Sequence, residues 1–176
     1  MVVDTIVILI HIRPMPLPST ASPGFQALTA VYQTMAIEFQ HLKAITLAQW
    51  ALESGWGKTG LASKYNNYAG MKYRATDHPG GVPVLYTAHD GREHYTHFRT
   101  HADFIAGYWH RLDTIPLYKD WREHAHDPKA FILFIAPRWR NGRTVLESTA
   151  RGYARDILGI AEKRTADLFP QAQESP

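Results

Sequence analysis

Apolar side chains recur every three or four residues in four stretches of this chain, which is the spacing of one face of an α-helix. These stretches cover residues 22–39, 41–53, 100–112 and 145–163. Ser22 and Pro23 provide a cap and a first-turn proline for the first predicted helix, and Gly55 ends the second. A shorter apolar helix is expected to start at Asp127 and to end before Pro137.

Residues 82–98 have a different pattern. Two runs rich in β-branched and aromatic residues, VPVLYTA and REHYTHF, flank Asp90 and Gly91, a strong signal for a hairpin turn. The pattern as a whole therefore predicts an α+β domain that is mostly helical and carries one small β-hairpin lobe.

The length of 176 residues fits one domain with one sizeable core. We expect residues 1–21 to form an arm and linker, residues 22–165 the packed domain, and residues 166–176 a tail. The apolar run at 5–12 (TIVILIHI) is too short to cross a membrane. It is also a poor export signal, because Asp4 precedes it and prolines follow it.

Composition excludes some classes of function. The chain has no cysteine, so it forms no disulfide and no thiolate metal site. His94 and His97 would point to opposite faces of a strand, and no other metal-ligand pattern is present, so no metal is expected. The net charge is only +3 and the basic residues are spread out, which argues against a nucleic-acid-binding surface.

One segment carries most of the candidate chemistry: residues 47–72, LAQWALESGWGKTGLASKYNNYAGMK. Glu53 stands at the end of an apolar helix and is followed directly by a turn rich in glycine and tryptophan. A carboxyl group walled by such surface loses hydration, which raises its pKa toward the range of a general acid.

The residues around Glu53 suit a sugar ligand. Trp56 and Tyr68 offer flat apolar faces for stacking, and Asn66 and Asn67 offer amide groups for hydroxyl and N-acetyl groups. Cleavage of a glycosidic bond fits this set better than phosphate or acyl chemistry.

The same segment resembles a known family. Residues 51–58 (ALESGWGK), Leu61 and Ala62, and residues 66–72 (NNYAGMK) are similar to the glucosaminidase domain of glycoside hydrolase family 73. That family's pattern is roughly A-x-E-S-G-W-G-x-S-x-L-A followed by N-N-x-F-G-x-K, and the resemblance covers about residues 25–160. It implies a lysozyme-like fold and hydrolysis of the β-1,4 bond after N-acetylglucosamine in peptidoglycan.

By this resemblance Glu53 is the general acid, Trp56, Asn66, Asn67 and Tyr68 shape the sugar subsites, and no cofactor is needed. The implied partner is a peptidoglycan glycan strand, bound by a monomer. The implied location is the cell wall, the periplasm or the exterior. The poor export signal leaves two origins open: a bacterial autolysin, or a phage-encoded endolysin released without a standard signal peptide.

The sequence departs from the family in two places. Leu85 and Thr87 stand about where members place a second acid, and the nearest carboxylates are Asp90, which also suits a turn, and Glu93. If neither reaches the site, the substrate's own N-acetyl group could stabilise the oxocarbenium centre. The second departure is the family's late tyrosine motif, where Trp139 could instead form the wall of the cleft.

Two alternatives stay open. A muramidase or a lytic transglycosylase of lysozyme-like fold would also use one essential glutamate. A wall-binding module that kept the cleft and lost turnover would explain the missing hairpin acid.

Overall fold

The computed structural model describes residues 17–75, 80–88 and 91–169. Within these ranges the helices are α1 (Pro23–Thr34), α2 (Lys43–Ser54), α3 (Gly60–Tyr65), α4 (His101–Thr114), α5 (Pro128–Asn141) and α6 (Ser148–Ile160), and the strands are β1 (Gly81–Ala88) and β2 (Gly91–Phe98). Short 3-10 turns lie at Gln40–Leu42, Pro116–Tyr118, Trp121–His124 and Ala166–Leu168, and a π turn at Ala161–Thr165.

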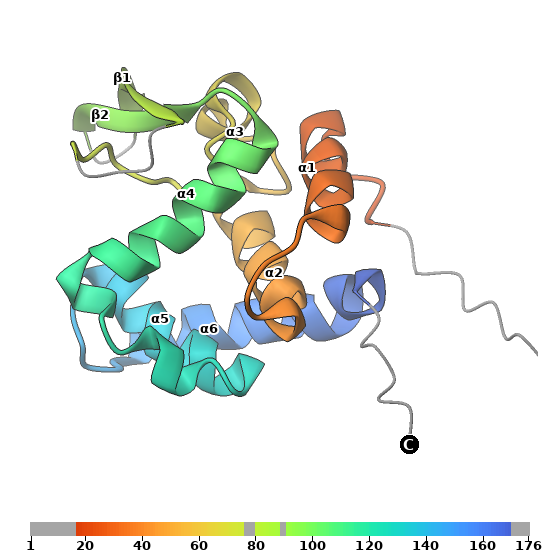
Figure 1. The fold of residues 1–176 in the computed structure, drawn as a ribbon, viewed down its shortest axis with the longest axis vertical. Coiled ribbons are helices and arrows are strands. Elements are labelled where there is room, and N and C mark those ends of the chain that lie inside the picture. The colour runs from red at the N-terminus through yellow and green to blue at the C-terminus, as the bar shows by residue number, and fades with distance from the viewer. Residues whose placement is uncertain (1–16, 76–79, 89–90, 170–176) are drawn as a thin grey trace, which may run out of the picture.

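The predicted fold class, α+β and mostly helical with one hairpin, is confirmed. Figure 1 shows the hairpin and α3 at one end of the molecule, α5 and α6 at the other, and α4 running between them. No helix in the described part of the chain combines the length and the apolar character that a bilayer crossing requires.

Helix α2 forms the centre of the core. Its Trp50 is fully buried, and the rings of Tyr32, Phe104 and Tyr108 lie 4.7, 4.9 and 5.2 Å from the Trp50 ring. Aromatic groups packed at these distances and angles stabilise a core beyond the area they bury. The end of α2, which carries Glu53, is therefore held firmly.

Helix α1 begins as predicted and ends earlier. The Ser22 hydroxyl accepts a hydrogen bond from the Phe25 amide at 3.1 Å, which caps the helix. The expected continuation to Phe39 is wrong, because Met35 adopts extended backbone with ψ 127°. Phe39 instead packs on Trp121, with ring centroids 5.3 Å apart.

The hairpin is antiparallel, with a register running from Gly81 opposite Phe98 to Ala88 opposite Gly91. Asp90, in the predicted turn, lies outside the described residues. Directly opposed residues share a face and successive residues alternate. Tyr86 is therefore on the same face as Ala88, and Leu85 is on the other face.

Helix α5 does not end before Pro137, so this prediction was wrong. The proline lies inside the helix, which continues to Asn141 and closes at Gly142, where φ is +64°. Proline removes one backbone donor, and the amides of Gly142 and Arg143 still bond to Arg138 O and Pro137 O. The basic residues after Pro137 thus form a last helical turn that carries Trp139.

The chain after α6 stays packed against the domain. The Thr165 hydroxyl donates to Ala44 O at 2.7 Å, and Gln33 Nε2 donates to Leu168 O at 3.0 Å. Both Thr165 and Leu168 are buried. These contacts fix the far end of α6 against α1 and α2.

Candidate active site

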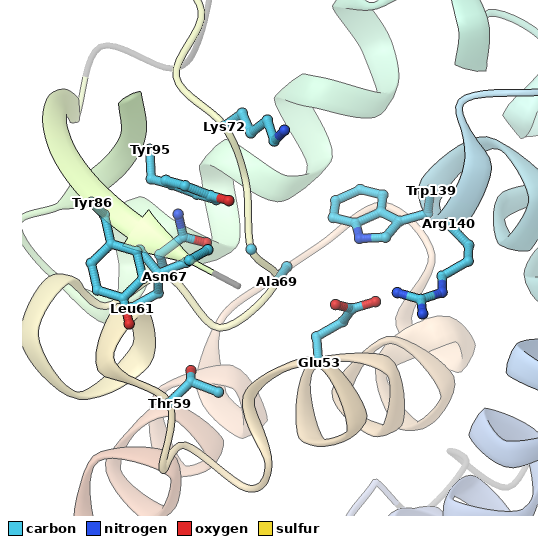
Figure 2. A pocket seen from close by; sticks show the side chains of 12 residues that line it. Glu53, Thr59, Leu61, Asn67, Ala69, Lys72, Tyr86, Tyr95, Trp139 and Arg140 are labelled. Carbon is cyan, nitrogen blue, oxygen red and sulfur yellow. The ribbon is translucent and has the colours of Figure 1, made fainter. Parts of the chain in front are cut away.

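A pocket of about 490 Å³ lies where the end of α2, the α3 region, the hairpin and the last turn of α5 meet. Its walls are polar and aromatic, and they consist of Glu53, Thr59, Leu61, Asn67, Ala69, Gly70, Lys72, Tyr86, Ala88, Tyr95, Trp139 and Arg140. Figure 2 shows Glu53 with Arg140 and Trp139 on one side and Asn67, Tyr86 and Tyr95 on the other.

Glu53 is the next-to-last residue of α2 and is partly buried. Tyr153 of α6 donates a hydrogen bond from its hydroxyl to Glu53 Oε1 at 2.6 Å. The second oxygen, Oε2, lies on the side of Gly70, 4.0 Å from the position that a Cβ on this glycine would take. The carboxyl group is thus fixed through one oxygen, and the pocket opens beside it.

Burial raises the pKa of Glu53 above its ordinary value of 4.5. The hydrogen bond from Tyr153 and the positive charge of Arg140 act in the opposite direction, because both stabilise the carboxylate. The balance favours a carboxyl group that keeps its proton at a higher pH than a solvated glutamate does. Such a group is suited to protonate a leaving oxygen.

The hydrogen bond to Glu53 is the last of a buried series that links three helices. Tyr108 of α4 donates to Gln49 Oε1 at 2.6 Å, and Gln49 Nε2 donates to the Tyr153 hydroxyl at 3.1 Å. Tyr108 and Gln49 are fully buried. Every donor in this series points toward Glu53, so the network fixes the direction of the Tyr153 O–H bond.

The turn after Glu53 uses left-handed backbone at three consecutive residues, Gly55, Trp56 and Gly57, with φ of 55°, 60° and 82°. Trp56 was predicted to bind sugar. The structure packs its ring edge-on against Phe25 at 5.5 Å, and Trp56 is not among the residues that line the pocket. Its carbonyl accepts from the Ser22 amide at 3.0 Å, so the turn joins α2 to the start of α1.

The predicted amide ligands bind backbone in this structure. Asn66 caps α3 and donates to Phe98 O at 3.0 Å. Asn67 is buried and lines the pocket, but its Nδ2 donates to Thr96 O at 2.8 Å and to Met71 O at 2.9 Å. The two residues attach the hairpin to α3.

Tyr68, another predicted sugar contact, lies in the core. It is 1% exposed, and its hydroxyl pairs with His101 Nε2 at 3.0 Å. Its ring packs on Phe25 and Phe104. Burial raises the pKa of Tyr68 to about 12, so this phenol stays neutral.

The hairpin presents Tyr86, Ala88 and Tyr95 to the pocket. Leu85 and Thr87, where a second acid was sought, are on the opposite face of β1 by strand alternation. Ala88 occupies the pocket-facing position next to the turn, and its methyl group offers no acid–base chemistry.

Among the described residues that line the pocket, Glu53 is the one carboxylate. Glu93, a candidate second acid, is half exposed and pairs with Lys72 Nζ at 2.6 Å. It is on the same face as Tyr86, its partner in the register, but it does not line the pocket. Asp90, the other candidate, lies outside the described residues.

Trp139, predicted as a wall residue, lines the pocket and packs on Tyr108 with ring centroids 5.3 Å apart. Sequence reasoning did not name Tyr153, which bonds to Glu53, or four further lining residues: Arg140, Lys72, Tyr86 and Tyr95. Alternation along the hairpin could have found Tyr86 and Tyr95, which share a face. No local signal could have paired Tyr153 with Glu53.

A partly buried carboxyl group lies beside aromatic rings in a pocket between a helical lobe and a hairpin, which is the arrangement expected of a glycoside hydrolase of lysozyme-like fold. The chain belongs to the glucosaminidase family, described as mannosyl-glycoprotein endo-β-N-acetylglucosaminidase, whose model matches residues 29–165. The resemblance seen in the sequence is therefore confirmed. No curated protein sequence matches this chain.

Two solved structures are similar. The catalytic domain of the autolysin Auto from Listeria monocytogenes is 15% identical, with a TM-score of 0.53, over 84% of this chain and 87% of that domain. A peptidoglycan hydrolase mutant from Sphingomonas sp. A1 is 17% identical, with a TM-score of 0.43, over 78% of this chain and 88% of that one. The first of these likenesses supports the fold.

Proposed function

We propose that this protein hydrolyses the β-1,4 bond after N-acetylglucosamine in peptidoglycan, at the cell wall, with Glu53 as the general acid. Family membership supports the activity, and the similarity in fold to an autolysin catalytic domain supports the wall as its site of action. The observation that carries the proposal is the Glu53 carboxyl group, which is desolvated, oriented by Tyr153 and placed in an open pocket with aromatic walls.

In the proposed reaction, protonated Glu53 donates its proton to the glycosidic oxygen as the bond to C1 breaks. The Tyr153 hydroxyl keeps the donor oxygen in place and stabilises the carboxylate that remains. Carboxylate 53 then accepts a proton from the water that attacks C1, which restores the acid.

The positive charge that develops at C1 as the bond breaks also needs to be stabilised. Because Glu53 is the one carboxylate among the described lining residues, we propose that the carbonyl oxygen of the substrate's N-acetyl group bonds to C1. Water then opens this intermediate. Arg140 lies beside Glu53 and favours its ionised form after the proton has left.

The test is a zymogram on purified peptidoglycan, followed by mass spectrometry of the borohydride-reduced products. Wild type is expected to clear the gel and to leave reducing N-acetylglucosamine, and Glu53→Gln is expected to lose at least about a hundredfold in rate. Glu162→Gln, at an exposed site that does not line the pocket, serves as the matched control.

Other outcomes decide between the alternatives. Reducing muramic acid would identify a muramidase, and a 1,6-anhydro end a transglycosylase. Equal clearing by wild type and Glu53→Gln would refute the role of Glu53. Binding to walls without any clearing would identify a binding module. Loss of activity in Glu93→Gln or Asp90→Asn would assign the second acid to that residue.

A further inference from the structure

The two oxygens of the Glu53 carboxyl group have different surroundings. Oε1 accepts the hydrogen bond from the Tyr153 hydroxyl at 2.6 Å. Oε2 has no hydrogen-bond partner among the described residues, and it is not one of their buried unpartnered polar atoms, so it is open to the pocket. Figure 2 shows the carboxyl group directed from α2 into the space between Ala69 and Arg140 in that view. The two oxygens can therefore have different roles.

The hydrogen bonds behind Oε1 have a fixed direction, which a buried tyrosine sets. Tyr108 is fully buried, and in the described part of the chain the one acceptor for its hydroxyl is Gln49 Oε1, at 2.6 Å. If the Gln49 amide were turned over, this hydroxyl would face an NH2 group and lose its acceptor, and a buried donor without an acceptor is costly. The Gln49 oxygen therefore faces Tyr108, and Nε2 faces the Tyr153 hydroxyl at 3.1 Å.

This direction decides which oxygen of Glu53 carries the proton. The Tyr153 oxygen accepts from Gln49 Nε2, so its own hydrogen is directed to its other partner, Glu53 Oε1. In a neutral carboxyl group the carbonyl oxygen is the acceptor and the hydroxyl oxygen is the donor. Oε1 is therefore the carbonyl oxygen of protonated Glu53, and Oε2 carries the hydrogen.

A glycine leaves room beside Oε2. Gly70 lines the pocket, and its backbone is left-handed, with φ of 62°. A Cβ at this residue would lie 4.0 Å from Glu53 Oε2, and no other described atom beyond its chain neighbours lies within 4 Å of that position. A general acid needs the accepting atom within about 2.6–3.2 Å. An oxygen that close to Oε2 on the Gly70 side would overlap a Cβ, so it fits only next to glycine.

We propose that Glu53 delivers its proton from Oε2, and that the space beside Gly70 receives the glycosidic oxygen. This inference rests on the proposed function. As the bond between C1 and oxygen breaks, its electron pair stays on the oxygen, which takes the proton from Oε2 and leaves carboxylate 53. The bond from Tyr153 to Oε1 holds the carboxyl group throughout this step, and so keeps Oε2 in place.

The position of the proton is tested by neutron diffraction from deuterium-exchanged crystals, at a pH low enough for Glu53 to be protonated. We expect deuterium on Glu53 Oε2, on the Tyr153 oxygen in the direction of Oε1, and on Gln49 Nε2 in the direction of Tyr153. Deuterium on Glu53 Oε1, donated to the Tyr153 oxygen, would overturn the inference. This measurement does not depend on activity.

The place of the glycosidic oxygen is tested by adding a Cβ at residue 70. Gly70→Ala and Gly70→Asn are expected to lose at least about a hundredfold in kcat on peptidoglycan strands, because the Cβ displaces the reacting oxygen. Binding to walls, measured by sedimentation, should persist. Asparagine tolerates left-handed backbone better than alanine does, so Gly70→Asn is the variant with less strain.

Gly142→Ala is the matched control for backbone strain. Its φ of 64° is similar to that of Gly70, a Cβ there meets nothing within 4 Å, and it does not line the pocket of Glu53. The left-handed backbone should give it a loss of stability similar to that of Gly70→Ala in thermal unfolding. Its rate on peptidoglycan should equal that of wild type.

Other results would overturn the inference. If Gly70→Ala and Gly70→Asn are folded and cleave as fast as wild type, the glycosidic oxygen does not lie beside Gly70, and the role of Glu53 stays intact. An equal loss of rate in Gly142→Ala would assign the effect to backbone strain and overturn the inference as well. If wild type cleaves no peptidoglycan, the proposed function fails, and the deuterium position alone then decides the assignment of the proton to Oε2.

Discussion

Three influences, which act in opposite directions, set the pKa of Glu53. Burial acts most strongly and favours the neutral acid, while the Tyr153 hydroxyl and the Arg140 charge favour the carboxylate. A general acid works only while it holds its proton, so its activity falls as pH rises through its pKa. Changing either neighbour should therefore move the pH profile in a known direction.

Tyr153→Phe removes the donor that stabilises the Glu53 carboxylate. The pKa of Glu53 then rises further, so the descending limb of kcat/KM against pH is expected to move to higher pH. Arg140→Gln should shift the limb in the same direction, because it removes a positive charge. Both profiles are measured on soluble glycan strands. A limb that moves to lower pH would contradict this account of the site.

Tyr153→Phe also has a cost in stability. Gln49 is fully buried and donates to the Tyr153 hydroxyl, so Tyr153→Phe leaves a buried amide donor without this acceptor. An unmet buried donor costs about 1–3 kcal/mol. Urea unfolding measures this loss in the free energy of unfolding. The pH profiles are recorded under conditions well below the unfolding midpoint of the variant, so that its lower stability does not affect them.

Among the elements, the turn at 55–57 sets the path of the chain after Glu53. Its left-handed backbone ends α2 at Ser54, one residue after the acid, and joins the chain to the start of α1 through the Trp56 carbonyl. At Gly57 a Cβ would lie 2.3 Å from Ser22 Oγ and 2.9 Å from Phe25 Cβ. Backbone preference and space both require glycine at this position.

Gly57→Ala is therefore expected to destabilise the fold by about 1–3 kcal/mol. Gly159→Ala is the matched control, because a Cβ at this helical site meets nothing within 4 Å and its φ is ordinary. That change should be neutral or stabilise by about 0.5–1 kcal/mol. Urea unfolding compares the two variants, and equal effects would refute the close contact at Gly57.

Element identity was more predictable than element length. The cap at Ser22 is a local signal and was predicted, and Thr100, where the third predicted helix begins, caps α4: its Oγ1 accepts from the Asp103 amide at 3.0 Å. A helix end was predicted at Pro137, but packing holds α5 together on both sides of it: Ala136, before it, is fully buried, and the ring of Trp139, after it, packs on Tyr108. Such packing comes from elements far away in the sequence.

At the scale of the molecule, the pocket lies between two parts that differ in how deeply they are packed into the core. One wall is the end of α2, which is buried in the core, and the other is a two-stranded sheet whose β2 has exposed residues at its start. An isolated hairpin is marginal in water, and this one relies on contacts such as Asn67 with Thr96 O.

The hairpin is expected to open locally without global unfolding. In hydrogen exchange followed by mass spectrometry, amides of Gly81–Ala88 should exchange at least about tenfold faster than those of Lys43–Ser54. Such opening would let a long glycan strand enter from the side. Equal exchange in both segments would show that the molecule unfolds as one unit.

How much of the site was predictable depends on how far its parts are separated along the chain. Glu53 and Trp139 were named from the sequence, and both line the pocket. Trp56 and Tyr68 were also named, but aromatic side chains fill cores as readily as they bind sugars, and these two pack on Phe25. Tyr153 lies within the last predicted helical stretch, residues 145–163, and helical periodicity does not say which residue the apolar face of such a helix meets.

The distance along the chain between Glu53 and Tyr153, one hundred residues, has a consequence for synthesis. The ribosome makes the acid early and the hydroxyl that orients it late. An unfinished chain therefore carries the glutamate without its oriented setting.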